Sequence, residues 1–283
     1  MALHNTQLTG PGGAELRLSD VDPLSHAVSL GDAQTIAMVR TALETKRLRL
    51  AFQPIMATAD LDHPAFYEGL IRVLDPTGRV IPARDFITIV ESQDLGRLID
   101  CAALELGLNT LLRYPRLRLS LNMSARSIGY PRWVATLRRG LKASPTVGER
   151  LILEIAESSV NLVPELVSEF MEALQPEGVC FALDGFGAGL TALRHLRDFY
   201  FDILKVDGQF IRGIDQNPGN RMLVRSFVLM AQQFDLLTVA ESVETMAEAE
   251  ALQRIGIDAM QGYLLGAPSV MPEFQKKDQQ RLA

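Results

Sequence analysis

Polar side chains that can bind metal ions or phosphate follow successive apolar segments of this chain. In chain order they are Glu68, Arg72, Asn122, Glu154, Glu157, Asp184, Lys205, Asp207, Glu241, Glu244 and Gln261. Taken singly, each would more often be a solvated loop residue. As a set of polar groups that end one apolar segment after another, they are poorly explained by chance.

Several carboxylates that share one pocket repel each other and need cations nearby. Carboxylates and an Asn carbonyl are hard oxygen ligands, which suit Mg²⁺, Mn²⁺ or Ca²⁺. A zinc hydrolase site is not expected, because the four histidines are scattered at His4, His26, His63 and His195. An acidic metal site that also holds one lysine and one arginine suits a phosphoester, since metals neutralise phosphate and activate water.

The segment 181–189, FALDGFGAG, is the most distinctive of these segment ends. An apolar run closed by glycines predicts a buried strand that runs into a tight loop. Asp184 then lies at the carboxyl end of the strand, and the glycines permit positive φ and close approach of a ligand to the backbone. The alternative for this segment alone is an ordinary strand-to-helix turn with a solvated Asp.

The composition and charge of the chain exclude several classes of function. The net charge of −6 and pI near 5.3 argue against a nucleic-acid-binding surface, so no DNA or RNA partner is expected. We find no apolar run of ~18 residues and no signal-peptide pattern at the N-terminus, so we expect no membrane partner and a cytoplasmic protein. Cys101 and Cys180 lack metal-ligand spacing and are expected to be reduced packing residues.

Strands and helices alternate along the chain. We predict strands over 47–55, 65–73, 118–123, 151–155, 179–183, 201–206, 236–240 and 258–261. We predict helices over 32–45, 82–91, 95–113, 133–141, 164–174, 191–198, 218–234 and 246–255. Residues 1–32 are interpreted as a mobile arm, 33–272 as one domain, and 273–283 as a polar, frayed tail.

Eight strands that alternate with helices indicate a parallel α/β fold, and within one domain they favour a TIM-like (β/α)8 barrel. An open doubly wound sheet is the structural alternative. The sequence contains no GxGxxG or GxxxxGK[ST] segment, the usual nucleotide-binding reason for an open sheet. In a barrel, the polar residues listed above converge on the mouth formed by the carboxyl ends of the strands.

These residues also carry a family resemblance. The chain resembles an EAL domain, the family of cyclic di-GMP phosphodiesterases, from about residue 48 to residue 268. The naming tripeptide corresponds to Glu68-Gly69-Leu70 in YEGLIR, and LSLNMSAR, LILEIAES, ILKVDGQFI, TVAESVET and MQGYLLGAP resemble further family segments. The resemblance implies a TIM-like barrel, with a first strand that can run antiparallel, and hydrolysis of cyclic di-GMP to linear pGpG.

The resemblance also implies roles for individual residues. Ligands of a first metal would be Glu68, Asn122, Glu154 and Asp184, and Glu241 would bind a second metal that Asp184 bridges. Lys205 would hold the attacking water, which makes Lys205, Glu241 and Glu68 the catalytic set. Arg72 would contact a phosphate, and Glu157 would brace the loop after the fifth strand. Gln53, Asp207, Glu244 and Gln261 would line the dinucleotide pocket. The implied cofactor is Mg²⁺ or Mn²⁺, with Ca²⁺ as an inhibitor.

Two positions depart from the family pattern. The family's E-A-L is here E-G-L, where Gly69 is expected to matter modestly. The family's D-D-F-G-T-G is here D-G-F-G-A-G, so Gly185 removes a carboxylate from the second metal site and Ala188 removes a hydroxyl. Two interpretations follow: an enzyme with weakened turnover, or a degenerate cyclic di-GMP receptor or protein-interaction module. A scaffold that has also lost the ligand is disfavoured by Glu68, Arg72 and Asn122.

A homodimer is a further hypothesis that the resemblance implies. Family members pair through helices beside the loops after the fifth and sixth strands. The apolar residues available there are Leu190, Leu193, Leu196, Phe199, Tyr200 and Phe201. The alternative is that these side chains pack onto the barrel of their own chain.

Overall fold

The computed structural model describes residues 23–91, 93–189 and 199–276 of the 283-residue chain. Its strands are β1 (Leu48–Ala57), β2 (Asp60–Leu74), β3 (Val80–Pro82), β4 (Leu119–Met123), β5 (Leu151–Ala156), β6 (Cys180–Phe186), β7 (Ile203–Val206), β8 (Leu237–Ala240) and β9 (Ala259–Met260). Its helices are α1 (Pro23–Glu44), α2 (Ile87–Val90), α3 (Asp94–Arg113), α4 (Pro131–Ala143), α5 (Glu157–Leu162), α6 (Pro164–Leu174), α7 (Gly208–Ile211), α8 (Pro218–Gln233) and α9 (Met246–Ile255).

Eight of the strands close into a barrel, as predicted. The hydrogen-bonded order is β1-β9-β8-β7-β6-β5-β4-β2, and pairing of β1 with β2 closes the ring. β2 and β4 to β9 are parallel neighbours, whereas β1 runs antiparallel to both β2 and β9. The expected antiparallel first strand is therefore confirmed. β3 adds to the free edge of the long β2 and stands outside the ring.

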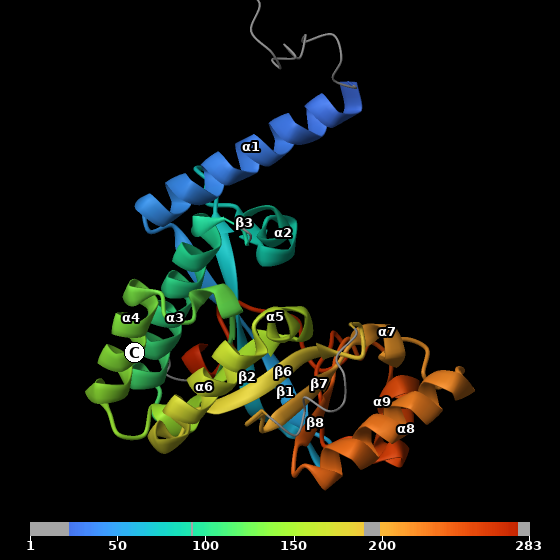
Figure 1. The fold of residues 1–283 in the computed structure, drawn as a ribbon. Helices are drawn as coiled ribbons and strands as arrows, with labels where there is room; N and C mark the ends of the chain where they lie inside the picture. Colours follow the sequence, from blue (N-terminus) through green and yellow to red (C-terminus); the bar gives the residue numbers. More distant parts are fainter. Residues whose placement is uncertain (1–22, 92, 190–198, 277–283) are drawn as a thin grey trace, which may run out of the picture.

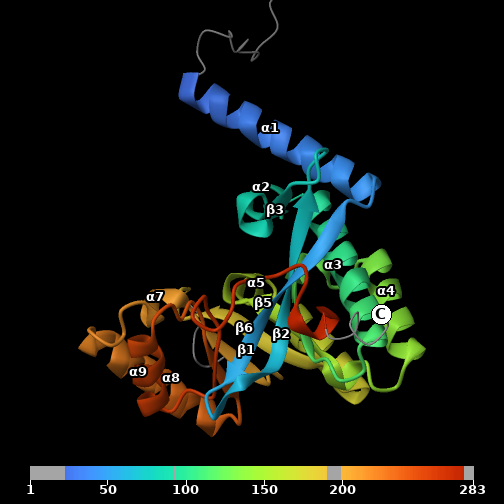
Figure 2. The same cartoon turned by 180° about the vertical axis from the view of Figure 1, so that it is seen from behind.

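The helices cover the outside of the barrel because each strand has an apolar outer face. Figures 1 and 2 show α3, α4 and α6 on one side of the strands and α8 and α9 on the other. The principal core cluster joins outward-facing strand residues such as Leu153, Phe181 and Leu204 to helix residues such as Trp133 and Leu104. Strands covered on both faces need continuous apolar runs, which is why β5 (LILEIA) is buried almost throughout.

The eight predicted barrel strands lie where the sequence placed them, whereas several short elements differ. The predicted helix 82–91 divides into a 3₁₀ turn, Ala83–Asp85, and α2. The one-turn or two-turn helices α5 and α7 and the edge strand β3 were not predicted. Elements this short have too few residues to show a periodic pattern. The predicted helix 191–198 lies outside the described residues.

Both ends of the described chain differ from the predicted arm and tail. α1 begins at Pro23, so part of the predicted mobile arm 1–32 is helical, and it lies beyond β3 and α2 (Figure 1). The prediction of a frayed tail is wrong for Phe274, whose ring lies 5.0–5.3 Å from the rings of Phe52, Tyr67 and Tyr114. A single aromatic side chain anchors the start of this polar segment, because burying its ring removes apolar area from water.

Among the helices of the described part of the chain, none combines the length and apolar character needed to cross a bilayer.

Candidate active site at the barrel mouth

An apolar floor inside the barrel supports the polar residues of the mouth. The floor consists of the buried residues Ile55, Phe66, Ile152, Ala182, Ile203, Val239 and Ala259. Side chains two positions apart share a face of a strand. The residues two positions nearer the mouth are therefore on the same inner face, and they are Gln53, Glu68, Glu154, Asp184, Lys205, Glu241 and Gln261. The strand period thus positions seven of the predicted site residues.

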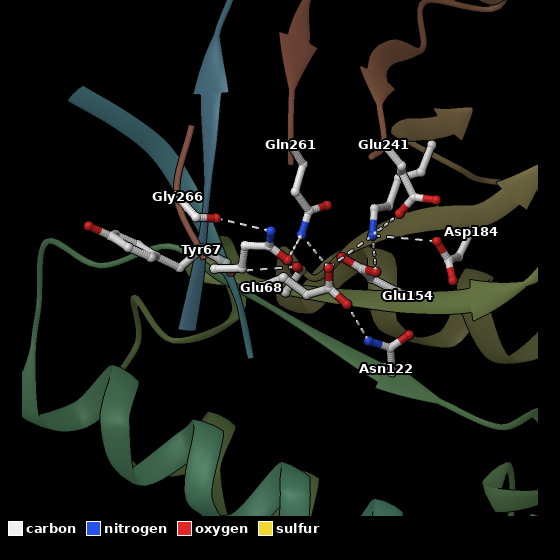
Figure 3. Close-up of polar contacts among 11 residues, drawn as sticks. Tyr67, Glu68, Asn122, Glu154, Asp184, Glu241, Gln261 and Gly266 are labelled. Carbon is white, nitrogen blue, oxygen red and sulfur yellow. Dashed lines mark hydrogen bonds and ion pairs between the residues drawn. The ribbon is translucent and has the colours of Figure 1, made fainter. Parts of the chain in front are cut away.

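Lys205 forms ion pairs with four of these residues, Glu68, Glu154, Asp184 and Glu241, which are labelled in Figure 3. Its Nζ is 2.6 Å from Glu154 Oε2 and 2.9 Å from Glu241 Oε1. It is also 3.2 Å from Glu68 Oε2 and 3.4 Å from Asp184 Oδ1. Lys205 and Glu154 are fully buried, whereas about a quarter of the Asp184 side chain and a fifth of the Glu241 side chain are exposed. Four carboxylates, one each from β2, β5, β6 and the residue after β8, therefore surround one ammonium group.

The cluster contains more negative charge than Lys205 neutralises. Burial raises the pKa of Glu154 to about 8, with Glu68 adding to the rise and Lys205 opposing it. Burial also raises the pKa of Glu241, again against the effect of Lys205. Burial alone would lower the pKa of Lys205, but the carboxylates, led by Glu154, outweigh it and raise that pKa well above its usual range. Such a cluster favours additional cations.

An amide network orients Glu68. Asn122 Nδ2 donates a hydrogen bond of 2.6 Å to Glu68 Oε1, and Gln261 Nε2 donates one of 2.7 Å to Glu68 Oε2. Gln261 Nε2 also lies 3.2 Å from Gln53 Oε1, and Gln53 Nε2 donates to the Gly266 carbonyl. Figure 3 shows these contacts on the inner side of the strands. Glu68 thus accepts hydrogen bonds from β4 and from the segment after β9 while contacting Lys205 of β7.

The glycine loop after Asp184 is tied to α5 through Glu157. This side chain is buried, and its Oε2 accepts hydrogen bonds from the Gly187 and Gly189 amides at 2.9 and 3.1 Å. Gly185 has φ +68°, a left-handed conformation that favours glycine. A Cβ at position 185 would lie 3.9 Å from Asp207 Oδ2, at ordinary contact distance. The position of the missing carboxylate is thus open and lies next to Asp207.

The remaining predicted residues lie at the edge of the mouth or beneath it. Asp207 caps α7 by accepting a hydrogen bond from Gln209 N at 2.7 Å. Glu244 lines a cavity of about 430 Å³ at the mouth, together with Gln53, Glu68, Glu241 and Gln261. Arg72 is buried, does not line this cavity, and donates to the Ile71 carbonyl at 3.0 Å. Burial lowers the pKa of Arg72, although Glu68 opposes the shift.

Sequence reasoning missed several residues that line the mouth cavity. Arg84, Arg212, Ser242 and Tyr263 come from four separate segments. Ser242 has φ +59°, and its Oγ accepts a 3.3 Å hydrogen bond from Arg212 Nη2. Of these four residues, Tyr263 could have been identified from the sequence, because it follows Gln261 by two positions. An aromatic side chain beside polar site residues suits base stacking. Arg84 lies in the 3₁₀ turn Ala83–Asp85 and Arg212 directly follows α7, and neither segment has a distinguishing sequence pattern.

The donor set at the mouth fits a hard divalent cation in chemistry and charge. Within the described residues, the buried oxygens Glu154 Oε1 and Asp184 Oδ1 accept no hydrogen bond, although the Lys205 ammonium lies 3.4 Å from Asp184 Oδ1. Buried oxygens without donors favour a bound cation. The described residues contain no group of three or more His, Cys, Asp or Glu side chains spaced for direct coordination. In this structure the carboxylates instead contact the Lys205 ammonium.

Asp100 of α3 fixes the loop that follows β4. Its Oδ2 accepts hydrogen bonds from Ser127 Oγ at 2.6 Å and from Ser124 N at 3.0 Å. Burial raises the pKa of Asp100 to about 6, and these hydrogen bonds offset only part of the rise. The loop that begins just beyond Asn122 is therefore held by a carboxyl group whose pKa is raised.

We predict that Asp100→Asn flattens the pH dependence of stability. The folded state binds the Asp100 proton more tightly than the unfolded state, so wild type loses stability as pH rises from about 4 through about 6. Partial solvent exposure reduces the full linkage to about 2 kcal/mol. Urea unfolding at pH 4.5 and 7 should show the advantage of Asp100→Asn over wild type growing by about 1 kcal/mol, because part of the linkage is already lost at pH 4.5. A difference that does not vary with pH would contradict the assignment.

Comparisons with known proteins add to this geometry. The EAL domain family matches residues 36–268. The chain is 29% identical over 250 residues to "Cyclic di-GMP phosphodiesterase PdeB" of Shewanella oneidensis, covering 87% of this chain and 29% of that protein. It is 30% identical over 234 residues to "Cyclic di-GMP phosphodiesterase PdeF" of Escherichia coli, covering 81% and 31%. The chain therefore spans about a third of the length of these relatives.

Solved structures of EAL domains have the same fold. The crystal structure of the FimX EAL domain from Pseudomonas aeruginosa bound to c-di-GMP has a TM-score of 0.76 and 25% identity, and covers 83% of this chain and 96% of that one. The c-di-GMP complex of the PaMucR phosphodiesterase has a TM-score of 0.74 and 28% identity, and covers 86% and 99%. With its closed barrel, its polar mouth and a family match over most of its length, this chain belongs to the EAL domain family.

Proposed function

We propose that this chain is a metal-dependent phosphodiesterase that hydrolyses cyclic di-GMP to linear pGpG. The observation that carries the proposal is the Lys205 cluster, in which four carboxylates surround one ammonium beside a cavity of about 430 Å³. Relatives named as cyclic di-GMP phosphodiesterases and EAL domains solved with c-di-GMP support the substrate. The identity of the metal, Mg²⁺ or Mn²⁺, is part of the proposal.

The residues of the mouth would have different roles in such a reaction. Bound Mg²⁺ or Mn²⁺ would neutralise phosphate charge and lower the pKa of water, and its ligands would be Glu68, Asn122, Glu154, Asp184 and Glu241. Lys205 orients the attacking water through its ammonium group. Arg72 supplies a cation to a phosphate, and Glu157 holds the glycine loop in place. The dinucleotide lies against Gln53, Asp207, Glu244 and Gln261.

The direct test is incubation of the protein with cyclic di-GMP and Mn²⁺, followed by chromatography for pGpG. Metal-dependent formation of pGpG supports the proposal, and Ca²⁺ in place of Mn²⁺ is expected to inhibit it. Binding of cyclic di-GMP without any product in Mg²⁺ or Mn²⁺ would instead favour the receptor interpretation.

Arg72→Ala is predicted to weaken cyclic di-GMP binding by about 1.5–3 kcal/mol, the scale of a hydrogen bond to a charged group. Its guanidinium is buried beside the site, so a phosphate would gain a partner that is little screened by water. Calorimetry in Ca²⁺, where turnover is expected to be inhibited, measures the affinity. Arg72→Lys is the matched control that keeps the charge and loses the planar donor pair. Equal affinities of wild type and Arg72→Ala would rule out the phosphate contact.

Gly185 favours a second candidate function, a catalytically degenerate cyclic di-GMP receptor or protein-interaction module. This glycine stands where the EAL pattern has a second Asp, and its left-handed backbone faces Asp207. With that carboxylate missing, Asp184 and Glu241 would be the remaining carboxylate ligands for a second metal. Weak occupancy would then limit any two-metal mechanism.

We predict that Gly185→Asp raises turnover at least tenfold, which corresponds to about 1.4 kcal/mol of barrier. The new Cβ meets only Asp207 Oδ2, at 3.9 Å, so the carboxylate has room beside a second carboxylate. Wild type should be weakly active in Mg²⁺ and recover partly in Mn²⁺, which binds such sites more tightly. The left-handed φ of +68° costs about 1 kcal/mol of stability for a non-glycine residue.

Gly185→Asn is the matched control, because it has the same shape and backbone strain but no charge. Rates of pGpG formation across a titration of Mg²⁺ and Mn²⁺ should rise for Gly185→Asp and not for Gly185→Asn. Brisk hydrolysis by wild type at low Mg²⁺, with no gain in Gly185→Asp, would make the missing carboxylate irrelevant.

A homodimer remains a separate proposal. Leu190, Leu193 and Leu196 lie outside the described residues. Phe199 and Phe201 are buried with ring centroids 5.6 Å apart, and Tyr200 is 40% exposed. Sedimentation over a range of concentrations, with and without cyclic di-GMP, tests the proposal, and a monomer under every condition would exclude it.

A further inference from the structure

Charged residues are unevenly distributed over the outer helices of the barrel. The segment 113–142 contains eight Arg or Lys residues and no Asp or Glu, although the whole chain has a net charge of −6. The segment 164–177 contains four Glu residues and no Arg or Lys. The first segment includes α4 and the second includes α6. Two neighbouring helices of the outer layer therefore have opposite charges.

α4 and α6 border a groove of about 760 Å³ on the outside of the barrel. They follow the parallel neighbours β4 and β5, so they lie side by side over the sheet. The floor of the groove is apolar, and Trp133 and Phe170 meet there with ring centroids 5.7 Å apart. The same face continues with Leu137, Leu141, Leu166 and Leu174, of which Leu166 is 42% exposed.

The two sides of the groove have opposite charges. Arg138 of α4 is exposed and lines one side, and the exposed Arg139 and Lys142 follow it on the same helix. Glu169 of α6 and Glu177 line the other side. A ligand that fills the groove therefore meets Arg138 along one flank and the carboxylates of Glu169 and Glu177 along the other.

We propose that this groove is a docking site for one amphipathic helix of a partner protein. An apolar stripe on that helix packs on Phe170 and Leu166, above the buried Trp133, as in other helix-in-groove complexes. The flank of the partner helix that faces α4 carries carboxylates, and the flank that faces α6 carries Lys or Arg. The charge pattern thus fixes the orientation of the partner as well as its chemistry.

Other occupants fit this groove less well. An anionic membrane or a nucleic acid would be attracted by α4 but repelled by Glu169 of α6 and by Glu177, which follows that helix. A second copy that presented the same face would place a groove against a groove, and no ridge would fill either one. The site shares no lining residue with the mouth cavity, so it is independent of the proposed hydrolysis.

Two synthetic helical peptides of about 18 residues, or five turns, test the proposal. Both are free of tryptophan and carry the same leucine stripe. The matched peptide has Glu on one flank and Lys on the other, placed to complement α4 and α6, and the all-lysine peptide has Lys on both flanks, so that reversing its direction cannot restore the match. Fluorescein anisotropy measures affinity. Emission of Trp133, the only tryptophan of the chain, reports occupancy of the groove.

We expect the matched peptide to bind at least tenfold more tightly than the all-lysine peptide and to shift the emission of Trp133. The variant Arg138→Glu, which places carboxylates on both flanks of the groove, should reverse this preference. Arg138 is exposed, so the variant should keep its melting temperature and its activity towards cyclic di-GMP. Equal affinity for the two peptides, no binding of either, or a preference that the variant leaves unchanged would overturn the proposal. Binding to vesicles of phosphatidylglycerol in place of the matched peptide would also overturn it.

Discussion

Glu68→Ala is expected to reduce metal-dependent hydrolysis of cyclic di-GMP by at least about a hundredfold, equivalent to about 2.7 kcal/mol of barrier. Glu68 contacts Lys205, Asn122 and Gln261 at once. Its loss removes one carboxylate from a site with few ligands, and a single ligand can decide metal occupancy. The same change should hardly alter the free energy of unfolding without metal, because relief of carboxylate repulsion offsets the lost hydrogen bonds.

Rates of pGpG formation and urea unfolding, measured on the same preparations, separate these two effects. Glu68→Gln is the matched control, since it keeps the size and one acceptor oxygen but loses the charge. We expect both variants to be inactive and folded. Mn²⁺-dependent activity at the wild-type level in folded Glu68→Ala would refute the metal assignment of Glu68.

Lys205→Met is expected to destabilise the metal-free protein by about 3–5 kcal/mol, the range for removing one partner of a buried ion pair. Four carboxylates, from Glu68, Glu154, Asp184 and Glu241, would then face each other with no ammonium between them. A divalent cation can replace the missing charge. Mn²⁺ should therefore stabilise Lys205→Met more than it stabilises wild type, even though the variant loses turnover.

Thermal unfolding in EDTA and in Mn²⁺ tests this prediction without reference to activity. Lys142→Met, which removes an exposed lysine on α4, is the control and should change neither the melting temperature nor its metal dependence. The prediction fails if Lys205→Met is as stable as wild type in EDTA. It also fails if Mn²⁺ shifts the melting temperatures of both proteins equally, because the ammonium and the metal would then not neutralise the same carboxylates.

The barrel could be predicted because its strands are long apolar runs with local signals at their ends. β5 (LILEIA) and β6 (CFALDGF) are buried over most of their length, and such runs stand out in any window of sequence. The period of two in a strand then determines that Glu154 and Asp184 share the inner face with Ile152 and Ala182. Elements of one or two turns, such as α5 and α7, were missed because tertiary contacts rather than a local pattern determine them.

By itself, the sequence determined which polar residues end the strands and, through the family resemblance, the reaction class to test. Only the tertiary structure decided which of them meet, since Glu68 and Lys205 are 137 positions apart in the chain and Glu68 and Gln261 are 193 apart. It also brought Arg84, Arg212 and Tyr263 to the mouth cavity and placed Phe274 against Phe52. Such contacts depend on closure of the barrel, which sets the distances between strands that no local spacing in the sequence encodes.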